Sequence, residues 1–147
     1  MKKGLIFLTA IAILFLVMGI ATAADLSNIK MPDGWDEVND GIYMMTGDSP
    51  EDGGHNLLIQ KFSDALKTTY YDNATGAGFV VDDKGNGTFV YTDEANKLGG
   101  SFEVVEIDGE ECFINFWFAG LDSSEIDKTY GYMMEFNELN GFEPVEV

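Results

Sequence analysis

The sequence contains no arginine and has only one cysteine, one histidine and three prolines among its 147 residues. One cysteine and one histidine are too few for a structural zinc site, an iron–sulfur ligand set or an internal disulfide framework. Arginine is the residue that most often binds carboxylates and phosphates through two parallel hydrogen bonds, and its absence argues against anionic substrates. We therefore expect no cofactor, no zinc or iron–sulfur centre and no anionic substrate.

Positive charge of any kind is scarce. Eight lysines stand against 26 carboxylates, which gives a formal net charge of −18. Such a chain is repelled by a phosphate backbone, so nucleic-acid binding is excluded as an expected function. The expected partners are cationic, basic or neutral surfaces. The acidity is equally consistent with adaptation to salty surroundings.

The first 23 residues have the pattern of an export signal. Lys2 and Lys3 precede an almost unbroken apolar run, Leu5 to Ile20, and Ala21-Thr22-Ala23 offers a small-x-small cleavage site. The run is short for a membrane span, which needs about 20 residues. The pattern predicts a signal peptide over residues 1–23 and a secreted or cell-surface protein. The alternative is an uncleaved leader in which residues 4–20 anchor the chain to the cytoplasmic membrane with the domain outside.

Residues 24–147 form the predicted mature domain. Cleavage removes two of the eight lysines and no carboxylate, so the net charge of the remaining 124 residues is 6 − 26 = −20. A chain of this length buries enough surface for one core. No linker or repeat divides it, and aromatic residues make up 13% of the whole sequence, which argues against disorder. We expect one acidic globular domain.

Turn-forming residues between apolar runs predict a sheet of hairpins. Asp108-Gly109 joins two such runs, and a turn over 82–87 joins two more. The run from Asn56 to Phe62 also fits a helical template, but we favour a strand there, followed by a short helix from Asp64 to Tyr71 with Ser63 as its N-cap. The predicted strands are Ile42–Met45, Asn56–Phe62, Phe79–Val81, Thr88–Tyr91, Phe102–Ile107 and Glu111–Phe118.

A long helix is predicted near the end of the chain. Asp122 and Glu125 have capping-box spacing at its start, and Asn140-Gly141 can end it with a left-handed residue. Residues 145–147 are expected as a closing edge strand. The whole pattern predicts an α+β domain in which an antiparallel sheet of hairpins packs against this C-terminal helix, with 112–118 as a central strand buried on both faces.

Two acidic loops are the candidates for calcium. The loop 82–87 places Lys84 at the third EF-hand position and an aspartate, Asp93, at the twelfth, and strands flank it. It fails as an EF-hand and is predicted to be a hairpin turn. The loop from Asp48 to Asp52 stays open as a looser cation-binding surface.

Support for catalysis is limited. A Cys–His pair needs Cys112 and His55, but Cys112 lies in an apolar run and His55 lies beside a predicted loop. Cys112 is best explained as a core residue, with an intermolecular disulfide or a nucleophile left open. Two carboxylates suffice for glycoside cleavage, so a hydrolase of a neutral polymer is retained as an alternative. We assign no catalytic, cofactor-binding or metal-binding residue.

Two further kinds of surface site are suggested by the sequence. Trp117, followed by Trp35, is the aromatic residue to test for stacking on sugars, although rings in such a run usually belong to a core. Asn73 and Asn86 each begin an N-glycosylation acceptor pattern.

The ending 133–140, with Pro144 after it, and the Asp108-Gly109 turn resemble small exported proteins of methanogenic archaea, which have a signal peptide and one α+β domain of unassigned role. More loosely, a sheet with a long C-terminal helix is similar to the PsbP and Mog1 type of fold. Neither resemblance implies a catalytic residue. We expect an extracytoplasmic, non-enzymatic binding or interaction protein of unknown ligand.

Overall fold

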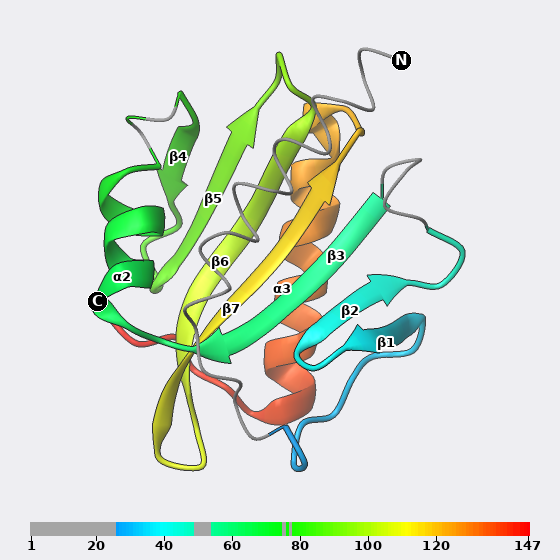
Figure 1. The fold of residues 1–147 in the computed structure, drawn as a ribbon, viewed down its shortest axis with the longest axis vertical. Coiled ribbons are helices and arrows are strands. Elements are labelled where there is room, and N and C mark those ends of the chain that lie inside the picture. Colours follow the sequence, from blue (N-terminus) through cyan, green and yellow to red (C-terminus); the bar gives the residue numbers. More distant parts are fainter. Residues whose placement is uncertain (1–25, 49–53, 75, 77) are drawn as a thin grey trace.

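The computed structural model describes residues 26–48, 54–74, 76 and 78–147. The predicted leader, residues 1–23, lies outside the described residues, as do 49–52 of the acidic loop. Figure 1 shows one strongly twisted sheet with the C-terminal helix α3 across one face and the short helix α2 at one end. Within the described ranges, no helix is long and apolar enough to cross a membrane.

The seven strands among the described residues belong to one antiparallel sheet, in the order β1-β2-β3-β7-β6-β5-β4. The order follows from hairpins that pair neighbours in sequence, together with a long-range pairing of β3 with β7. The strands are β1 (Trp35–Asn39), β2 (Ile42–Met45), β3 (Gly54–Lys61), β4 (Val80–Asp83), β5 (Thr88–Asp93), β6 (Leu98–Ile107) and β7 (Glu110–Ala119). This arrangement confirms the predicted α+β class.

Strand β7 lies at the centre of the sheet and is buried on both faces, as predicted. Its side chains alternate between two cores, because successive residues of a strand point to opposite faces. Phe116 belongs to the core under α3, and Phe113 and Trp117 belong to the core on the other face. The turn from β6 to β7 has Asp108 at φ 52° and Gly109 at φ 85°, the left-handed pair that a two-residue hairpin requires.

The predicted short helix is confirmed, and it covers part of the core on the face of the sheet away from α3. Helix α2 (Asp64–Lys67) begins where the Ser63 hydroxyl accepts a hydrogen bond from the Leu66 amide, at 3.3 Å. The chain continues as one π-helical turn, η1 (Thr68–Asp72), which the sequence did not indicate. This turn places the Tyr70 ring 4.4 Å from the ring of Phe113, centroid to centroid.

Helix α3 (Ile126–Asn140) follows a 3₁₀ turn, η2 (Ser123–Glu125). The predicted capping box is wrong, because the Asp122 side chain makes no capping hydrogen bond and the Glu125 carboxylate contacts the His55 ring. The predicted end is right: Gly141 is left-handed at φ 69°, and the Phe142 amide donates to the Asn137 carbonyl.

The structure departs from the predicted strands in two other places. β1 was not predicted; it is an exposed edge strand held by pairing with β2. Residues 145–147 form no strand. The Val145 amide instead donates to the Val104 carbonyl at 2.8 Å, beyond the point where β5 stops pairing with β6.

Replacement by alanine should have opposite effects on the stability of the fold at two glycines. A Cβ atom on Gly100 would lie 2.7 Å from the Phe116 backbone oxygen and 2.5 Å from the Tyr91 hydroxyl oxygen, whereas one on Gly131 in α3 meets no atom within 4 Å. Gly100→Ala should lower the free energy of unfolding by about 2 kcal/mol through overpacking. Gly131→Ala should raise it by about 1 kcal/mol through helix propensity. Urea denaturation measures both, and equal effects would contradict the packing described.

Candidate functional site

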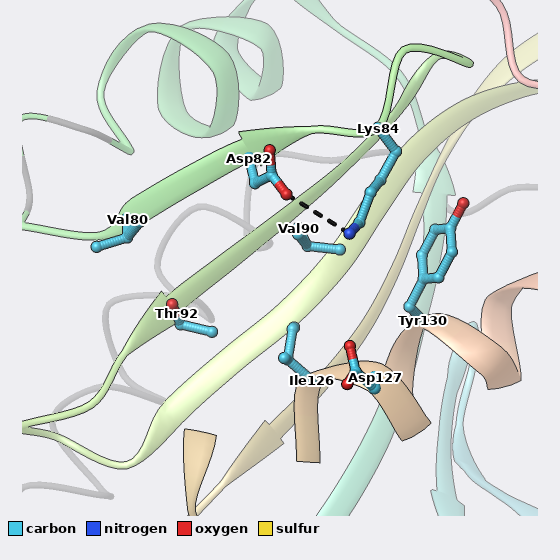
Figure 2. Close-up of a pocket in the computed structure, with 8 residues that line it drawn as sticks. All are labelled: Val80, Asp82, Lys84, Val90, Thr92, Ile126, Asp127 and Tyr130. Carbon is cyan, nitrogen blue, oxygen red and sulfur yellow. Dashed lines mark ion pairs between the residues drawn. The ribbon is translucent and has the colours of Figure 1, made fainter. Parts of the chain in front are cut away.

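A groove of about 260 Å³ lies between the β4–β5 hairpin and the first turns of α3 (Figure 2). It opens to solvent, since Val80 on its outer wall is 70% exposed. Apolar side chains from three elements line it together with acidic, basic and hydroxyl groups. The lining residues are Val80, Asp82, Lys84, Val90, Thr92, Ile126, Asp127 and Tyr130.

Strand alternation and helix periodicity bring these residues together. Val80 pairs with Thr92, and Asp82 pairs with Val90, so the two strands present these side chains on the same face of the sheet. On α3, Ile126 and Tyr130 are four residues apart and therefore share one side of the helix. The groove is the space left between this side of the helix and the hairpin.

Lys84 extends into the groove, and its ammonium group is held there. The Nζ atom lies 3.5 Å from Oδ2 of Asp82 and 5.4 Å from the centroid of the Tyr130 ring. Asn86 donates from Nδ2 to the Tyr130 hydroxyl at 3.2 Å, which fixes the ring from the turn side. Figure 2 shows the lysine extending from the hairpin toward Asp82, with Tyr130 on the neighbouring helix. A carboxylate and an aromatic face are together a binding site for an ammonium ion.

The groove has more negative than positive charge. Asp82 and Asp127 both line it, whereas Lys84 is its one basic residue. None of the ion pairs found among the described residues involves Asp127. Asp127 is also suited to the first turn of α3, where the helix dipole favours an acidic side chain. The groove can therefore attract a second cation.

His55, expected beside a loop, is instead a buried residue of β3 under the start of α3. Its Nε2 lies 3.1 Å from Oε2 of Glu125, and its Nδ1 lies 3.3 Å from the Thr129 hydroxyl. A carboxylate can only accept, so the neutral ring carries its proton on Nε2. Desolvation lowers the pKa of His55, and the neighbouring Glu125 opposes this shift.

The group formed by Thr129, His55 and Glu125 has the residue types of a hydrolytic triad but cannot act as one. The Thr129 hydroxyl donates to the Glu125 carbonyl at 2.8 Å and is completely buried. A nucleophile must reach a substrate, and no substrate can reach this oxygen in the folded protein. We interpret the group as a structural contact between β3 and α3.

Glu103 is a second buried ionisable group under α3. It lies on β6 with no exposed surface, and Oε2 accepts a hydrogen bond from Nδ2 of Asn137 at 2.9 Å. The other carboxyl oxygen of Glu103 has no hydrogen-bond partner among the described residues. Two nearby oxygens also have none: Oδ1 of Asn137 and the hydroxyl of Thr88, the residue opposite Glu103 on β5. Burial raises the pKa of Glu103 to about 7. A protonated carboxyl can donate to one of these oxygens, which a carboxylate cannot do.

The structure places Cys112 and His55, the pair considered for catalysis, far apart. Cys112 pairs with Lys61, whereas His55 pairs with Phe118 at the other end of β3. Six residues of β-strand correspond to about 20 Å, so the two cannot act together. Cys112 is buried, which raises the pKa of its thiol to about 11, and its place in the core confirms the interpretation as a packing residue.

Neither tryptophan offers a free ring. Trp117 is 7% exposed within the core on the α2 side. Trp35 packs edge-to-face on Phe116 and Tyr132, with centroid separations of 5.3 and 5.5 Å. Both rings therefore stabilise the fold.

Cation ligands are dispersed in the part of the chain that the structure describes. No three histidine, cysteine, aspartate or glutamate side chains are grouped there closely enough to hold a metal ion. The segment 82–87 closes the β4–β5 hairpin, as predicted; Asp82 and Asp83 are the last residues of β4, and Asp83 and Asn86 accept hydrogen bonds from backbone amides. The loop Asp48–Asp52 is described only at Asp48, whose carboxylate accepts from the His55 amide.

Sequence reasoning missed the groove because its walls are distant in the chain. The hairpin itself was predicted, but the only ligand that its sequence suggested was a cation in the turn 82–87, where Lys84 is a departure from the EF-hand pattern. Ile126 and Tyr130 lie within the predicted C-terminal helix, but nothing in the sequence indicates that their side of the helix extends past the strands it covers. The asparagines of the two glycosylation patterns are both described, with Asn86 engaged at the rim of the groove.

Comparison with known proteins gave no match to the chain among protein-family models, curated proteins or solved structures.

Replacing Glu103 should stabilise the protein above neutral pH. The folded-state pKa of about 7 exceeds the ordinary 4.5, so the folded protein binds more protons between these values, and stability falls as pH rises through that window. Glu103→Gln keeps the hydrogen bond from Asn137 and adds donors for the unpartnered oxygens. We expect it to raise the free energy of unfolding at pH 8 by about 3 kcal/mol, with little effect at pH 4.5. Urea denaturation at both pH values measures this, with Glu138→Gln on the exposed side of α3 as control. A gain that does not depend on pH would contradict it.

His55 should show the opposite pH trend. Its folded-state pKa lies below 6.5, so its contribution to stability is present above that value and is lost as pH falls toward the folded pKa. Glu125→Gln removes the charge that opposes the shift and should lower the His55 pKa further. Titration of the ring by NMR measures both pKa values and reports the Nε2–H tautomer. A raised pKa in the variant would refute the assigned contact.

Proposed function

We propose that the chain is a non-enzymatic binding protein that works outside the cytoplasm and that its groove between β4–β5 and α3 receives a positively charged group. One observation supports the site above all others: the chain's own Lys84 ammonium is already held there by Asp82 and Tyr130. The extracytoplasmic location rests on the leader pattern of residues 1–23.

The charge of the chain supports the same ligand class. A net charge of −18 creates a field that attracts cations and raises their rate of encounter. At the groove this field combines with the carboxylate of Asp127, which lies on the wall opposite Asp82. The volume of about 260 Å³ fits one amine-bearing side chain or a small amine better than a large ligand.

A hydrolase of neutral polymers remains the second candidate, because Asp82 and Asp127 enter one groove from opposite walls. Glycoside cleavage needs one carboxyl that protonates the leaving group while shielded from water. Asp82 is committed to Lys84, and its side chain is 65% exposed. The groove is also small for a polymer. Release of reducing ends from a neutral polysaccharide that is lost in Asp127→Asn would establish this activity in place of binding.

Removing Lys84 should strengthen the binding of an external amine. Lys84→Met frees Asp82 and the Tyr130 ring. Cadaverine should therefore bind this variant roughly fivefold more tightly than it binds the unchanged protein. Lys97→Met is the matched control, because it removes the same charge from an exposed pair with Asp122. NMR titration measures both, with shifts expected at Ile126 and Tyr130.

The same titration includes two further controls. Asp127→Asn should weaken cadaverine binding, and succinate, a dianion of similar length, should not bind at the groove. Equal strengthening by Lys84→Met and Lys97→Met would show that only net charge matters. Shifts scattered over the whole surface would show that the groove is not the site.

A further inference from the structure

Strand β4 ends the sheet beside the groove, and one of its edges has no partner strand among the described residues. The Lys84 amide donates to the Thr88 carbonyl, at the close of the hairpin. In an antiparallel pair such bonding positions alternate, so Asp82 and Val80 also direct their backbone groups toward β5. Val81 and Asp83 must therefore direct their N–H and C=O groups away from the sheet. These four groups are a template for one more strand.

A strand added at this edge would place its side chains beside the groove. Residues directly opposite across two antiparallel strands have Cβ atoms about 5 Å apart, so every second side chain of the added strand would lie next to Val80 or Asp82. Val80 supplies apolar contact, being 70% exposed. A long cationic side chain starting there can reach Asp127 and the Tyr130 ring, which line the same groove.

We infer that an extended, basic segment of a partner protein pairs with β4 and places lysine or arginine side chains in the groove. This inference rests on the proposed function and adds the form of the ligand. Charge complementarity selects the occupant: Asp82 and Asp83 lie on the strand itself, Asp127 lies across the groove, and Lys84 is already paired. A second copy of this chain carries the same net charge of −18 and is repelled at low salt.

The opposite edge of the sheet is less suitable. The pairing of β1 with β2 shifts register between Glu37 and Asn39, which leaves Val38 as a bulged residue. A bulge bends an edge strand away from regular pairing and is a common protection against strand addition. The pairing of β4 with β5 is regular over all four residues.

An eight-residue peptide of alternating lysine and valine is the probe, with binding to the purified protein measured by calorimetry. We expect binding to the unchanged protein that weakens as salt rises, and no binding of the matched glutamate–valine peptide. Val81→Pro deletes one outward N–H group and keeps the hydrogen bonds to β5, but it also removes the packing of the half-buried Val81 side chain against the core on the α2 side. The variant should bind the lysine–valine peptide about tenfold more weakly than the unchanged protein does.

Val38→Pro on β1 is the matched control and should leave peptide affinity unchanged. If Val81→Pro does not fold, the lysine–valine peptide with N-methylated backbone amides replaces it on the unchanged protein and should bind about tenfold more weakly. Loss of affinity in Val38→Pro instead would place the partner on the other edge and overturn the inference.

Cadaverine separates this inference from the proposed function. If cadaverine binds at the groove but the peptide binds Val81→Pro as tightly as the unchanged protein, strand pairing is wrong and the amine site stands. If cadaverine does not bind, the proposed site itself fails. Self-association of the protein at low salt that Val81→Pro abolishes would assign the edge to a second copy and would also overturn the inference.

Discussion

Burial of β7 on both faces is the constraint on which the rest of the structure depends. An α-helix of 15 residues is about 22 Å long and about 10 Å wide, so it covers roughly two strands spaced 4.8 Å apart. The seven-stranded sheet is much wider than that. Helix α3 therefore lies over β6 and β7, where the apolar side chains are densest, and cannot also cover both ends (Figure 1). At the β1–β2 end Trp35 and Tyr132 fill the gap, whereas at the β4–β5 end the gap is the groove.

The same helix also has to match polar groups on the sheet. Thr129 lies over His55 and Asn137 lies over Glu103, so the inner side of α3 carries two polar residues where the sheet carries two ionisable ones. Neither ionisable residue is accessible to a ligand, and both act on stability with opposite pH trends. The groups that a partner can reach are consequently those at the β4–β5 end of the sheet, which helix α3 leaves uncovered. Surface carboxylates, one fixed ammonium and exposed backbone groups are suited to binding.

Local signals in the sequence predicted much of the fold. The Asp108-Gly109 turn, the Ser63 cap and Gly141 each act through a few neighbouring residues, and each was predicted correctly. Failures came where a distant partner decides the outcome. Glu125 contacts a histidine 70 residues away in place of the helix start, and β1 is a strand because β2 pairs with it. The groove could not be predicted for the same reason: the position of Lys84 relative to Tyr130 depends on how the helix crosses the sheet, which periodicity alone does not specify.

The proposed strand pairing depends on which backbone groups of β4 are free. Amide hydrogen exchange followed by NMR tests this directly in the protein with and without the lysine–valine peptide. In the free protein the Val81 and Asp83 amides should exchange quickly and the Asp82 amide slowly, and the peptide should slow Val81 and Asp83 selectively. Unchanged exchange at these two residues in the presence of bound peptide, or new protection on β1, would contradict the account.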